Sequence, residues 1–338
     1  MKAYRLHTVG DLKYEDIDRP LLQNNDWCLV KVHAAGICSS DIPRIFTKGT
    51  YHFPTIPGHE FSGEVYSIGD EKKQKLIGKR VGVFPLIPCR HCAQCSKSNY
   101  EMCAHYDYLG SRRDGGFAEY VAVPTWNLIE LPANVTYEQA AMLEPLSVAL
   151  HAITRGGVTS GMDVAIVGTG MIGISAGLWS MKVGATKVNI VGRSENKRKL
   201  VENMRLNYLD SSTEKLGEYD FILEAVGTPK TISQAIGIAK PGATVLLMGN
   251  PSGDILLQQD IYWRILRKQL TIKGAWNSKY DGEKISDWTK SISAIANGKI
   301  DVTKLISHKF SQDKLKDGLN LMYQHKEPYC KIMTLWNE

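Results

Sequence analysis

Hydrophobic and polar residues alternate along the first 150 residues in short runs that glycine and proline interrupt. Segments such as WCLVKVHAAGIC, FSGEVYSIG, KRVGVFPLIP and GGFAEYVAVP have the alternation of short strands. The closely spaced breakers between them are typical of turns. This part of the chain is therefore predicted to form a compact, mostly β domain.

The pattern changes at TYEQAAMLEPLSVALHAITRGG, which has the periodicity of a helix. From Asp163 onwards, apolar runs recur between segments of helix length: DVAIVG, KVNIVG, FILEAVG, ATVLLMG and LTIKGAW. Apolar strands that alternate with helices predict a parallel, doubly wound α/β sheet. After about Trp276 the chain becomes helical and polar, and PYCKIMTLW is expected to be a last strand that returns to the first domain.

Composition and charge restrict the class of protein. The 43% hydrophobic and 22% charged content is typical of a soluble globular chain, and no apolar run approaches a membrane span. The polar first twenty residues do not resemble a signal peptide. The net charge of +6 is dispersed, which favours an anionic ligand but not a nucleic-acid surface. We expect a cytoplasmic protein that binds neither nucleic acid nor membrane.

Four of the seven cysteines lie within fifteen residues, with the spacing C-x2-C-x2-C-x7-C: Cys89, Cys92, Cys95 and Cys103. Three are too close together to pair comfortably, and disulfide frameworks usually belong to short secreted chains. Four thiolates with this spacing can surround one Zn²⁺ ion as a tetrahedron. An iron–sulfur cluster is a minor alternative, because no proline-capped cluster motif is present. We predict a closed, structural zinc site.

The segment VGTGMIG directly follows an apolar strand and opens an apolar helix. It supplies Gly168, Gly170 and Gly173 in the order G-x-G-x-x-G, which in this context predicts a dinucleotide-binding loop. The first glycine permits a tight turn, the second admits a pyrophosphate, and the third lets the helix pack on its strand. The free N–H groups at the helix start, including Met171 and Ile172, would face the phosphates.

The end of the second strand of this domain discriminates between NAD and NADP. Proteins that bind NAD usually carry Asp or Glu there, but this chain has Gly192, followed by Arg193, Ser194, Lys197 and Arg198. Without a carboxylate to repel a phosphate, and with several donors to hold one, NADP(H) is favoured over NAD(H). Arg193, Ser194 and Arg198 are the expected contacts, although serine and lysine are also common at helix starts.

A second metal site is predicted from Cys38, His59, Glu60 and Glu144. Thiolate, imidazole and carboxylate together form an open zinc site, in which a position remains for water or substrate. Zinc there would stabilise the alkoxide formed when a secondary alcohol loses its proton. A lone cysteine is most often in the core and a His-Glu pair is most often on the surface, but their combination with a nucleotide loop favours the metal site.

These segments carry a resemblance to a known family. GHEFSG, the four-cysteine segment, GGFAEY, EPLSVALHA and VGTGMIG resemble the zinc-dependent medium-chain alcohol dehydrogenases, in particular the sorbitol and polyol branch. The resemblance covers essentially the whole chain. SSDIPRIFTKG, GSRRDGGFAEY and RILRKQLTIKGAW are more particularly similar to the dehydrogenases of polyol phosphates.

The resemblance implies an architecture and an assembly. It implies a GroES-like, mostly β catalytic domain made of residues 1–146 and 282–338, with a Rossmann domain of residues 147–281 between them. It also implies two zinc ions per chain and a homodimer or homotetramer that assembles through the edge of the Rossmann sheet.

Several residues match the family's functional positions. Cys38 and His59 match zinc ligands, Glu144 an acidic residue that binds the zinc directly or through water, and Glu60 a glutamate that coordinates when the metal's water exchanges. Ser40 matches the hydroxyl that relays the alcohol proton, and Asp41 a residue that supports the site. The family's relatives carry Asp where this chain has Gly192, so their preference for NAD does not carry over.

The implied activity interconverts a secondary alcohol of a polyol or polyol phosphate with the ketone by hydride transfer. A phosphate needs a cationic pocket, for which the candidates are Arg44, Lys48, Arg112 and Arg113, although each could also be a solvated surface charge. Threonine or general sorbitol dehydrogenase activity is the alternative within enzymes. A nucleotide-binding protein that kept the fold without catalysis is the alternative outside them.

Overall fold

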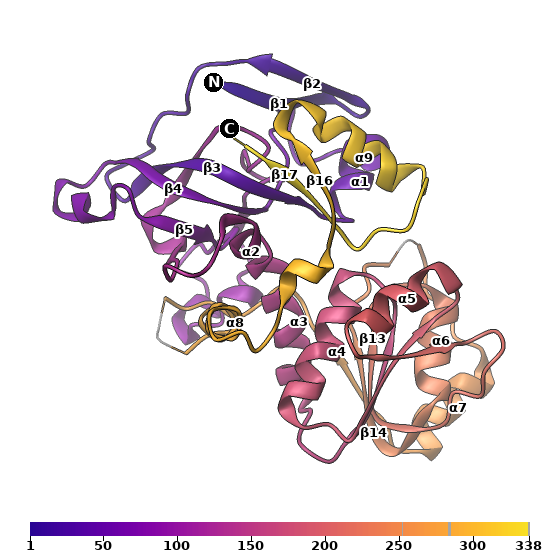
Figure 1. Cartoon of the computed structure of the whole chain (residues 1–338). Coiled ribbons are helices and arrows are strands. Elements are labelled where there is room, and N and C mark those ends of the chain that lie inside the picture. The colour runs from indigo at the N-terminus through magenta and orange to yellow at the C-terminus, as the bar shows by residue number, and fades with distance from the viewer. Residues whose placement is uncertain (252, 283–284, 337–338) are drawn as a thin grey trace. The chain divides into compact units, whose positions relative to one another are not determined.

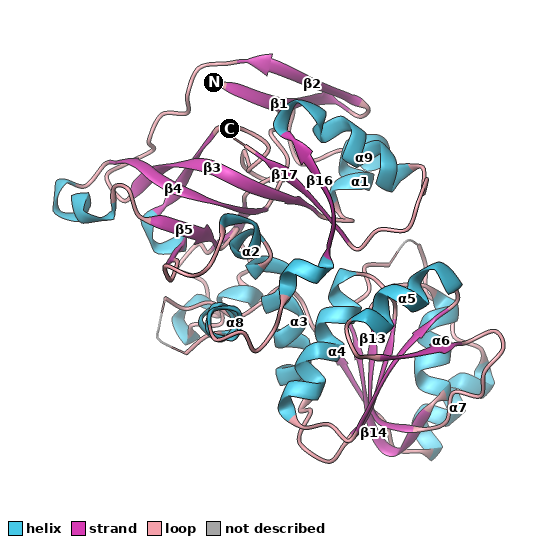
Figure 2. Cartoon of the chain, viewed as in Figure 1, coloured by secondary structure: helices cyan, strands magenta, loops and turns pink. Residues whose placement is uncertain are grey.

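The computed structural model describes residues 1–251, 253–282 and 285–336. The chain divides into two compact units (Figure 1). The first consists of Met1–Glu144 and Lys279–Glu338, and the second of Pro145–Ser278. Strands predominate in the first unit, whereas helices flank a central sheet in the second (Figure 2).

The first unit is built on a seven-stranded sheet with the strand order β16-β17-β3-β4-β5-β9, in which β8 also pairs with β3. Neighbouring strands within this sheet are antiparallel, except that β16 and β17 are parallel. Hairpin β1–β2 and the short pair β6–β7 form separate small sheets. The strands are β1 (Lys2–Thr8), β2 (Asp11–Asp16), β3 (Trp27–Ile37), β4 (Glu60–Ile68), β5 (Arg80–Val83), β6 (Leu86–Ile87), β7 (Asp107–Tyr108), β8 (Tyr120–Pro124), β9 (Leu128–Glu130), β16 (Ile306–Ser311) and β17 (Lys331–Leu335).

Strand β17, near the C-terminus, pairs with β3 from the N-terminal part of the chain. It lies between β16 and β3 in Figure 1, and its residues Ile332–Leu335 pair with Ala34–Ile37 of β3. The prediction that PYCKIMTLW returns to the first domain as a strand is thereby confirmed. Strand β3 has neighbours on both edges and is buried along most of its length.

Short helices and turns connect these strands. Helix α2 begins with a capping box of Thr136 and Gln139, and α8 with one of Ser286 and Thr289. Helix α9 packs on the sheet through buried Leu315, Leu319 and Met322. The helical segments are α1 (Asp41–Pro43), η1 (Arg44–Lys48), η2 (Glu71–Leu76), η3 (Cys95–Lys97), η4 (Tyr100–Met102), η5 (Thr125–Asn127), α2 (Tyr137–Ala141), α8 (Asp287–Ala296), η6 (Val302–Leu305), η7 (Gln312–Lys314) and α9 (Leu315–Tyr323).

The second unit is a six-stranded sheet with the order β12-β11-β10-β13-β14-β15, and every neighbouring pair is parallel. This confirms the predicted doubly wound α/β sheet. The strand order reverses between β10 and β13, which is where such folds bind ligands at the carboxyl ends of their strands. The strands are β10 (Asp163–Val167), β11 (Lys187–Gly192), β12 (Asn207–Asp210), β13 (Tyr219–Glu224), β14 (Ala239–Leu247) and β15 (Thr271–Gly274).

Helices follow the strands of this sheet. Helix α3 (Leu143–Gly156) precedes β10, and the others connect successive strands: α4 (Met171–Val183), α5 (Glu195–Asn203), α6 (Pro229–Gly237) and α7 (Gln259–Arg267). Val164, Ile166 and Ile190 are fully buried, as expected for central parallel strands. The sequence patterns did not predict β12, because this polar strand lies at the edge of the sheet.

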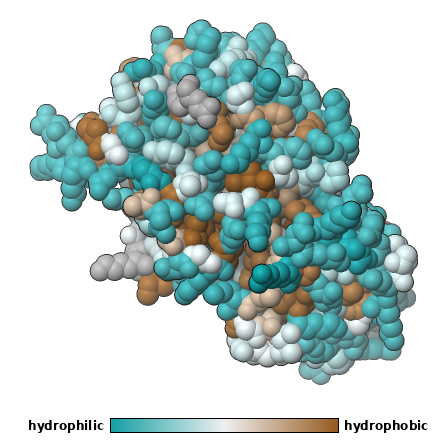
Figure 3. Space-filling model, viewed as in Figure 1, coloured by the Kyte–Doolittle hydropathy of each residue, from teal (hydrophilic) through white to brown (hydrophobic). Residues whose placement is uncertain are grey.

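Figure 3 shows one face of the molecule. The face in Figure 3 is covered largely by hydrophilic side chains, with hydrophobic ones in small groups between them. Among residues 1–251, 253–282 and 285–336, no helix has the length and hydrophobicity to cross a membrane.

Candidate metal and cofactor sites

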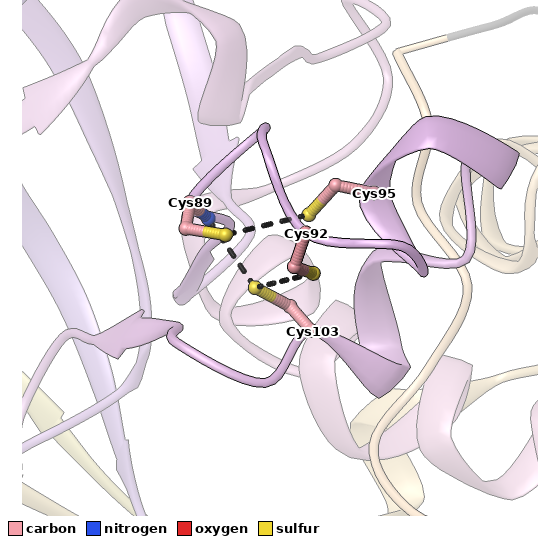
Figure 4. A group of neighbouring side chains, drawn as sticks. All are labelled: Cys89, Cys92, Cys95 and Cys103. Atoms are coloured by element: carbon pink, nitrogen blue, oxygen red, sulfur yellow. Dashed lines mark hydrogen bonds between the residues drawn. The ribbon is translucent and has the colours of Figure 1, made fainter.

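The four clustered cysteines of the first unit converge on one point. Their ligand atoms all lie within 4.8 Å of one another, and the sulfur atoms face each other in Figure 4. The Sγ atoms of Cys89 and Cys95 are 3.9 Å apart, and those of Cys92 and Cys103 are 4.0 Å apart. Four thiolates bound to one tetrahedral zinc ion would be about 3.8 Å apart. These separations are too long for disulfides and fit a metal.

Backbone N–H groups contact the sulfur atoms of the four-cysteine lobe, the segment that contains Cys89, Cys92, Cys95 and Cys103. The N–H of Cys89 donates to Sγ of Cys103 at 3.3 Å. Backbone N–H groups, first that of Ala104 and then that of Cys95, lower the pKa of the Cys92 thiol to about 5. Burial instead raises the pKa of the Cys95 thiol to about 12. The backbone therefore favours the thiolate form of Cys92, whereas burial disfavours that of Cys95, which a bound cation would stabilise.

A second cluster forms where β3 ends and β4 begins. Cys38 follows the last residue of β3, His59 immediately precedes β4, and Glu60 is the first residue of β4, the antiparallel neighbour of β3. One ligand atom from each of these residues lies within 4.8 Å of the other two. His59 is 3% exposed and Glu60 is 1% exposed. Sheet pairing therefore brings together three predicted ligands that are about twenty residues apart in sequence.

Asp41 lies at the centre of the contacts that support this cluster. Its Oδ2 accepts a hydrogen bond from the N–H of Cys38 at 2.9 Å, and its Oδ1 lies 3.4 Å from Nδ1 of His59. Burial opposes its ionisation, but His59 and then Arg44 lower the pKa of Asp41. Although burial opposes the charged imidazolium, Asp41 and then Cys38 raise the pKa of His59 well above its usual range. The Asp41 carboxylate thus contacts two of the predicted ligands: it accepts a hydrogen bond from the backbone N–H of Cys38, and it lies beside the imidazole of His59.

The donor set of the second cluster fits a zinc ion. A thiol, an imidazole and a carboxylate are the ligand types of open zinc sites. In addition, Nδ1 of buried His59 makes no hydrogen bond within the described part of the chain, which is costly unless the charge of Asp41 or a cation compensates. The two clusters together could hold two ions per chain.

Lys331, which the sequence patterns did not single out, binds the carboxylate of Glu60. Its Nζ donates to Oε2 of Glu60 and, at 3.1 Å, to the carbonyl of Ile37. Both side chains are buried, and Glu60 raises the pKa of Lys331 against the effect of burial. Gly36 makes room for this pair, because a Cβ there would lie 2.5 Å from Oε2 of Glu60. In the sequence, the only indication of this buried ion pair was a single lysine within the mostly apolar strand CKIMTLW.

Glu144 lies near this cluster but is not part of the group with ligand atoms within 4.8 Å. Its Oε1 accepts a hydrogen bond from the hydroxyl of Tyr108 at 3.2 Å. Burial raises the pKa of Glu144 to about 7. The Tyr108 ring also lies 5.7 Å from the His59 ring, so Tyr108 connects Glu144 to the cluster. Sequence reasoning missed Tyr108 because it lies in a two-residue strand without a recognisable pattern.

Ser40 and Arg44 contact the same cluster. The Ser40 hydroxyl donates to Sγ of Cys38 at 3.3 Å and accepts from Nη1 of Arg44 at 3.2 Å. Arg44 also pairs with Asp41 at 3.4 Å, and its side chain is 25% exposed. Lys48 lies on the same helical segment and is exposed. Arg44, one of the four predicted phosphate contacts, is therefore connected to the second cluster through Ser40 and Asp41.

Arg112 and Arg113 lie elsewhere in the first unit. The Arg112 guanidinium is 4.3 Å from the centre of the Tyr51 ring and 4.4 Å from that of Tyr106. Arg113 forms an ion pair with Asp107 at 2.6 Å. Both arginines line a hollow of about 340 Å³, and no residue of the second metal cluster is among its described lining residues. The ring contacts of Arg112 and the ion pair of Arg113 thus differ from the contacts of Arg44, which are to Ser40 and Asp41.

The glycine loop of the second unit has the geometry of a nucleotide site. Gly168 has a φ of 133°, which only glycine adopts readily. Gly170 is the N-cap of α4, and a Cβ at Gly173 would lie 2.1 Å from the carbonyl of Gly168. The helix thus starts at the turn itself, and the N–H groups of Met171 and Ile172 lie in its first turn, where the helix provides no acceptor.

Glu224, also missed from the sequence, fixes the two loops beside this turn. It is fully buried at the end of β13, opposite Val167 of β10. Its Oε1 accepts from the N–H groups of Val226 and Gly227 at 2.9 and 2.8 Å. Its backbone carbonyl accepts from Met248 and Gly249 at 2.9 and 3.1 Å. In the sequence, the indication of this role was a single glutamate within the otherwise apolar run FILEAVG.

The residues after β11 differ in their exposure and in the ion pairs that they form. Arg193 and Ser194 are exposed. The Arg198 guanidinium, in contrast, lies 2.9 Å from Glu195, 3.7 Å from Glu202 and 3.6 Å from Glu214. Three carboxylates thus surround the arginine that was predicted to contact the cofactor.

Comparison with known proteins identifies the family. Residues 24–133 match the alcohol dehydrogenase GroES-like domain and residues 171–297 match the zinc-binding dehydrogenase domain. The chain belongs to the zinc-binding alcohol dehydrogenases, and it is a dehydrogenase that uses a nicotinamide cofactor. The predicted family and fold class are confirmed.

Within this family, the chain is 34% identical over 342 residues to galactitol 1-phosphate 5-dehydrogenase of Escherichia coli K12, covering 97% of this chain and 98% of that enzyme. It is 31% identical over 322 residues to L-threonine 3-dehydrogenase of Vibrio vulnificus CMCP6, covering 91% of each chain.

Solved structures give the same result. The crystal structure of the Escherichia coli galactitol-1-phosphate dehydrogenase matches with a TM-score of 0.91 and 32% identity, covering 99% of this chain and 100% of that one. A zinc-binding dehydrogenase of Sinorhizobium meliloti 1021 bound to NADP matches at 0.88 and 28%, covering 99% and 98%. An alcohol dehydrogenase of Escherichia coli CFT073 complexed with NADH matches at 0.90 and 26%, covering 99% of each.

Proposed function

We propose that this dehydrogenase interconverts a secondary alcohol of a polyol phosphate, such as galactitol 1-phosphate, with the ketone, and that it prefers NADP(H). The similarity to the Escherichia coli enzyme over nearly the whole chain supports the substrate class. The observation that carries the proposal is Arg44, a partly exposed cation attached through Ser40 to the Cys38 cluster.

The two clusters would hold two zinc ions with different roles. Cys89, Cys92, Cys95 and Cys103 would enclose a structural ion. Cys38 and His59 would hold the catalytic ion, with a carboxylate of Glu60 or Glu144 as a further ligand. Zinc bound there supplies a Lewis acid that stabilises the alkoxide of the substrate.

The chain's own residues would move the alcohol proton and hold the substrate. The Ser40 hydroxyl lies beside Cys38 and can accept a proton from the substrate alcohol and pass it to solvent. Arg44 orients this hydroxyl through its hydrogen bond and would present its remaining N–H groups to the substrate phosphate. Lys331 would take no part in the proton transfer, because its buried ammonium group is already bound to Glu60.

Removing Arg44 tests the substrate. Arg44→Ala is expected to lower kcat/KM for galactitol 1-phosphate by roughly tenfold or more, because a charge-assisted contact to the phosphate is lost. The same variant should change kcat/KM for plain galactitol much less. Arg112→Ala is the matched control, since Arg112 lies between two tyrosine rings, and it should leave both constants unchanged. An equal loss on both substrates would show that Arg44 serves only Ser40 and Asp41.

Removing Arg193 tests the cofactor preference. Arg193→Ala is expected to weaken NADP(H) binding by about tenfold to hundredfold, the value of one or two hydrogen bonds to a charged phosphate. NAD(H) binding should hardly change. Dissociation constants can be followed by quenching of tryptophan fluorescence, with Lys199→Ala on the exposed surface of α5 as the control for general charge effects. A wild-type preference for NAD(H) of about tenfold would contradict the assignment.

We also propose that the protein is a homodimer or homotetramer and acts in the cytoplasm. Strand β15 is an edge of the sheet, with Ile272 39% exposed, and Trp276 beside it and Tyr262 of α7 are 57% and 55% exposed. An open edge with apolar neighbours suits pairing with a second copy. All seven cysteines are free, as expected for a reducing compartment.

A further inference from the structure

Gly192, the last residue of β11, is a glycine because of the space around it. Its φ lies outside the left-handed region, so its backbone does not require glycine. A Cβ at this position would lie 2.6 Å from Cγ2 of Thr169, 2.7 Å from Cε2 of Tyr208 and 2.7 Å from Oη of Tyr208. Side chains essentially never approach so closely. Any residue larger than glycine would therefore collide with Tyr208 and Thr169.

Tyr208 is held firmly in this place. It lies on β12, it is 2% exposed, and its ring packs beneath the Arg198 guanidinium at 4.6 Å. Its hydroxyl accepts a hydrogen bond from the N–H of Ser194 at 2.9 Å and donates one to the carbonyl of Ser194 at 3.0 Å. One side chain therefore fills the space over Gly192 and fixes the backbone of Ser194.

The same arrangement leaves the next side chains available. Ser194 is the N-cap of α5 but makes no side-chain cap hydrogen bond, so its hydroxyl is not used in the helix. Arg193 is exposed beside it. Arg198, in contrast, is engaged by Tyr208 and by carboxylates that include Glu195.

The acidic residue opposite Gly192 on the neighbouring strand does not replace the missing carboxylate. Asp210 pairs with Gly192 in the register of β11 and β12. Its Oδ1, however, accepts hydrogen bonds from the N–H of Ser212 at 2.8 Å and from the hydroxyl of Ser212 at 2.5 Å. Asp210 therefore serves the turn after β12.

We propose that Tyr208 is a specificity-determining positioning residue for the cofactor. It occupies the volume that a carboxylate at position 192 would need, and so excludes the group that hydrogen-bonds the ribose 2′-hydroxyl of NAD. It also fixes Ser194 so that the serine hydroxyl and the Arg193 guanidinium face a ribose 2′-phosphate. This inference rests on the proposed NADP(H) preference, which it explains by a residue that does not itself contact the phosphate.

A double-mutant cycle between Gly192 and Tyr208 tests this inference. The variants are Gly192→Asp, Tyr208→Leu and the double variant, and the measurements are thermal unfolding of the cofactor-free protein and dissociation constants for NADP(H) and NAD(H). Gly192→Asp alone should lower the unfolding temperature and weaken both cofactors, because the introduced side chain has no space. The double variant should regain stability relative to Gly192→Asp, since Leu is shorter than Tyr and Thr169 can rotate. It should also bind NAD(H) more tightly than NADP(H).

Tyr208→Phe separates the two roles of the side chain. It keeps the ring over Gly192 but removes both hydrogen bonds that fix Ser194. It should therefore weaken NADP(H) binding by roughly threefold to tenfold, the value of one hydrogen bond from the Ser194 hydroxyl to the phosphate, and leave NAD(H) binding nearly unchanged. A loss that is equal for both cofactors would contradict the role of the hydroxyl.

The outcomes separate this inference from the proposed function. If Gly192→Asp is as stable as wild type, or if the effects of the two substitutions simply add, Tyr208 does not exclude a carboxylate and the inference is wrong, whatever cofactor is used. If wild type binds NAD(H) more tightly than NADP(H), the proposed preference is wrong, while the unfolding temperatures still decide whether Tyr208 and position 192 compete for space.

Discussion

Replacing His59 with alanine is expected to remove one of two zinc ions and to lower kcat/KM by about a thousandfold or more. A zinc ion contributes several kcal/mol to the stabilisation of a developing alkoxide, and each 1.4 kcal/mol corresponds to about a factor of ten. Cys38 and a carboxylate alone do not provide the three protein ligands of an open zinc site. Zinc content per chain and the steady-state kinetics of the same preparation measure the effect.

Two further measurements make this result specific. The four-cysteine lobe should keep its ion, so that one zinc per chain remains, and circular dichroism should show an intact fold. His308→Ala is the matched control: His308 pairs with Glu327 and belongs to neither cluster, so this variant should retain two ions and full activity. A His59→Ala protein with two ions or wild-type turnover would contradict the catalytic assignment.

Replacing Cys95 with serine should affect stability instead of chemistry. Few apolar side chains hold the lobe around residues 89–103, so the metal is expected to supply much of its folding free energy. We expect a loss of at least about 3 kcal/mol, which lowers Tm by roughly 6–12 °C for a unit of this size. Metal content and thermal unfolding measure it.

The control for this prediction is Cys28→Ala, another buried cysteine of the same unit that is not in the lobe. It should retain two ions and lose only about 1 kcal/mol, as for a small core substitution. At a temperature well below its Tm, Cys95→Ser should retain the ion at Cys38 and a substantial part of its turnover. If Cys95→Ser unfolded at the wild-type temperature, the lobe would not be a structural zinc site.

The features that the sequence predicted are those in which short-range spacing determines geometry. Four cysteines within fifteen residues can meet only locally, and the strand–glycine–helix segment around Gly168 specifies its own turn. The apolar strands of the parallel sheet are likewise visible as runs. Strand β12 was not visible, because an edge strand does not need an apolar sequence.

The features that the sequence did not predict depend on pairing between distant segments. Lys331 and Glu60 lie 271 residues apart, and only the return of β17 to β3 brings them together. Tyr108 reaches Glu144 across 36 residues. The carboxylates around Arg198 are a further example, because its place after β11 did not indicate ion pairs with Glu195, Glu202 and Glu214.

The most direct measurement is a comparison of substrates by the zinc-loaded enzyme, followed by absorbance at the nicotinamide band with NADP⁺ and, separately, NAD⁺. The panel contains galactitol 1-phosphate, galactitol, sorbitol and L-threonine. We expect kcat/KM for galactitol 1-phosphate to exceed that for each unphosphorylated compound by at least about tenfold, the value of one charge-assisted contact. Equal or faster oxidation of sorbitol or L-threonine would contradict a polyol-phosphate dehydrogenase.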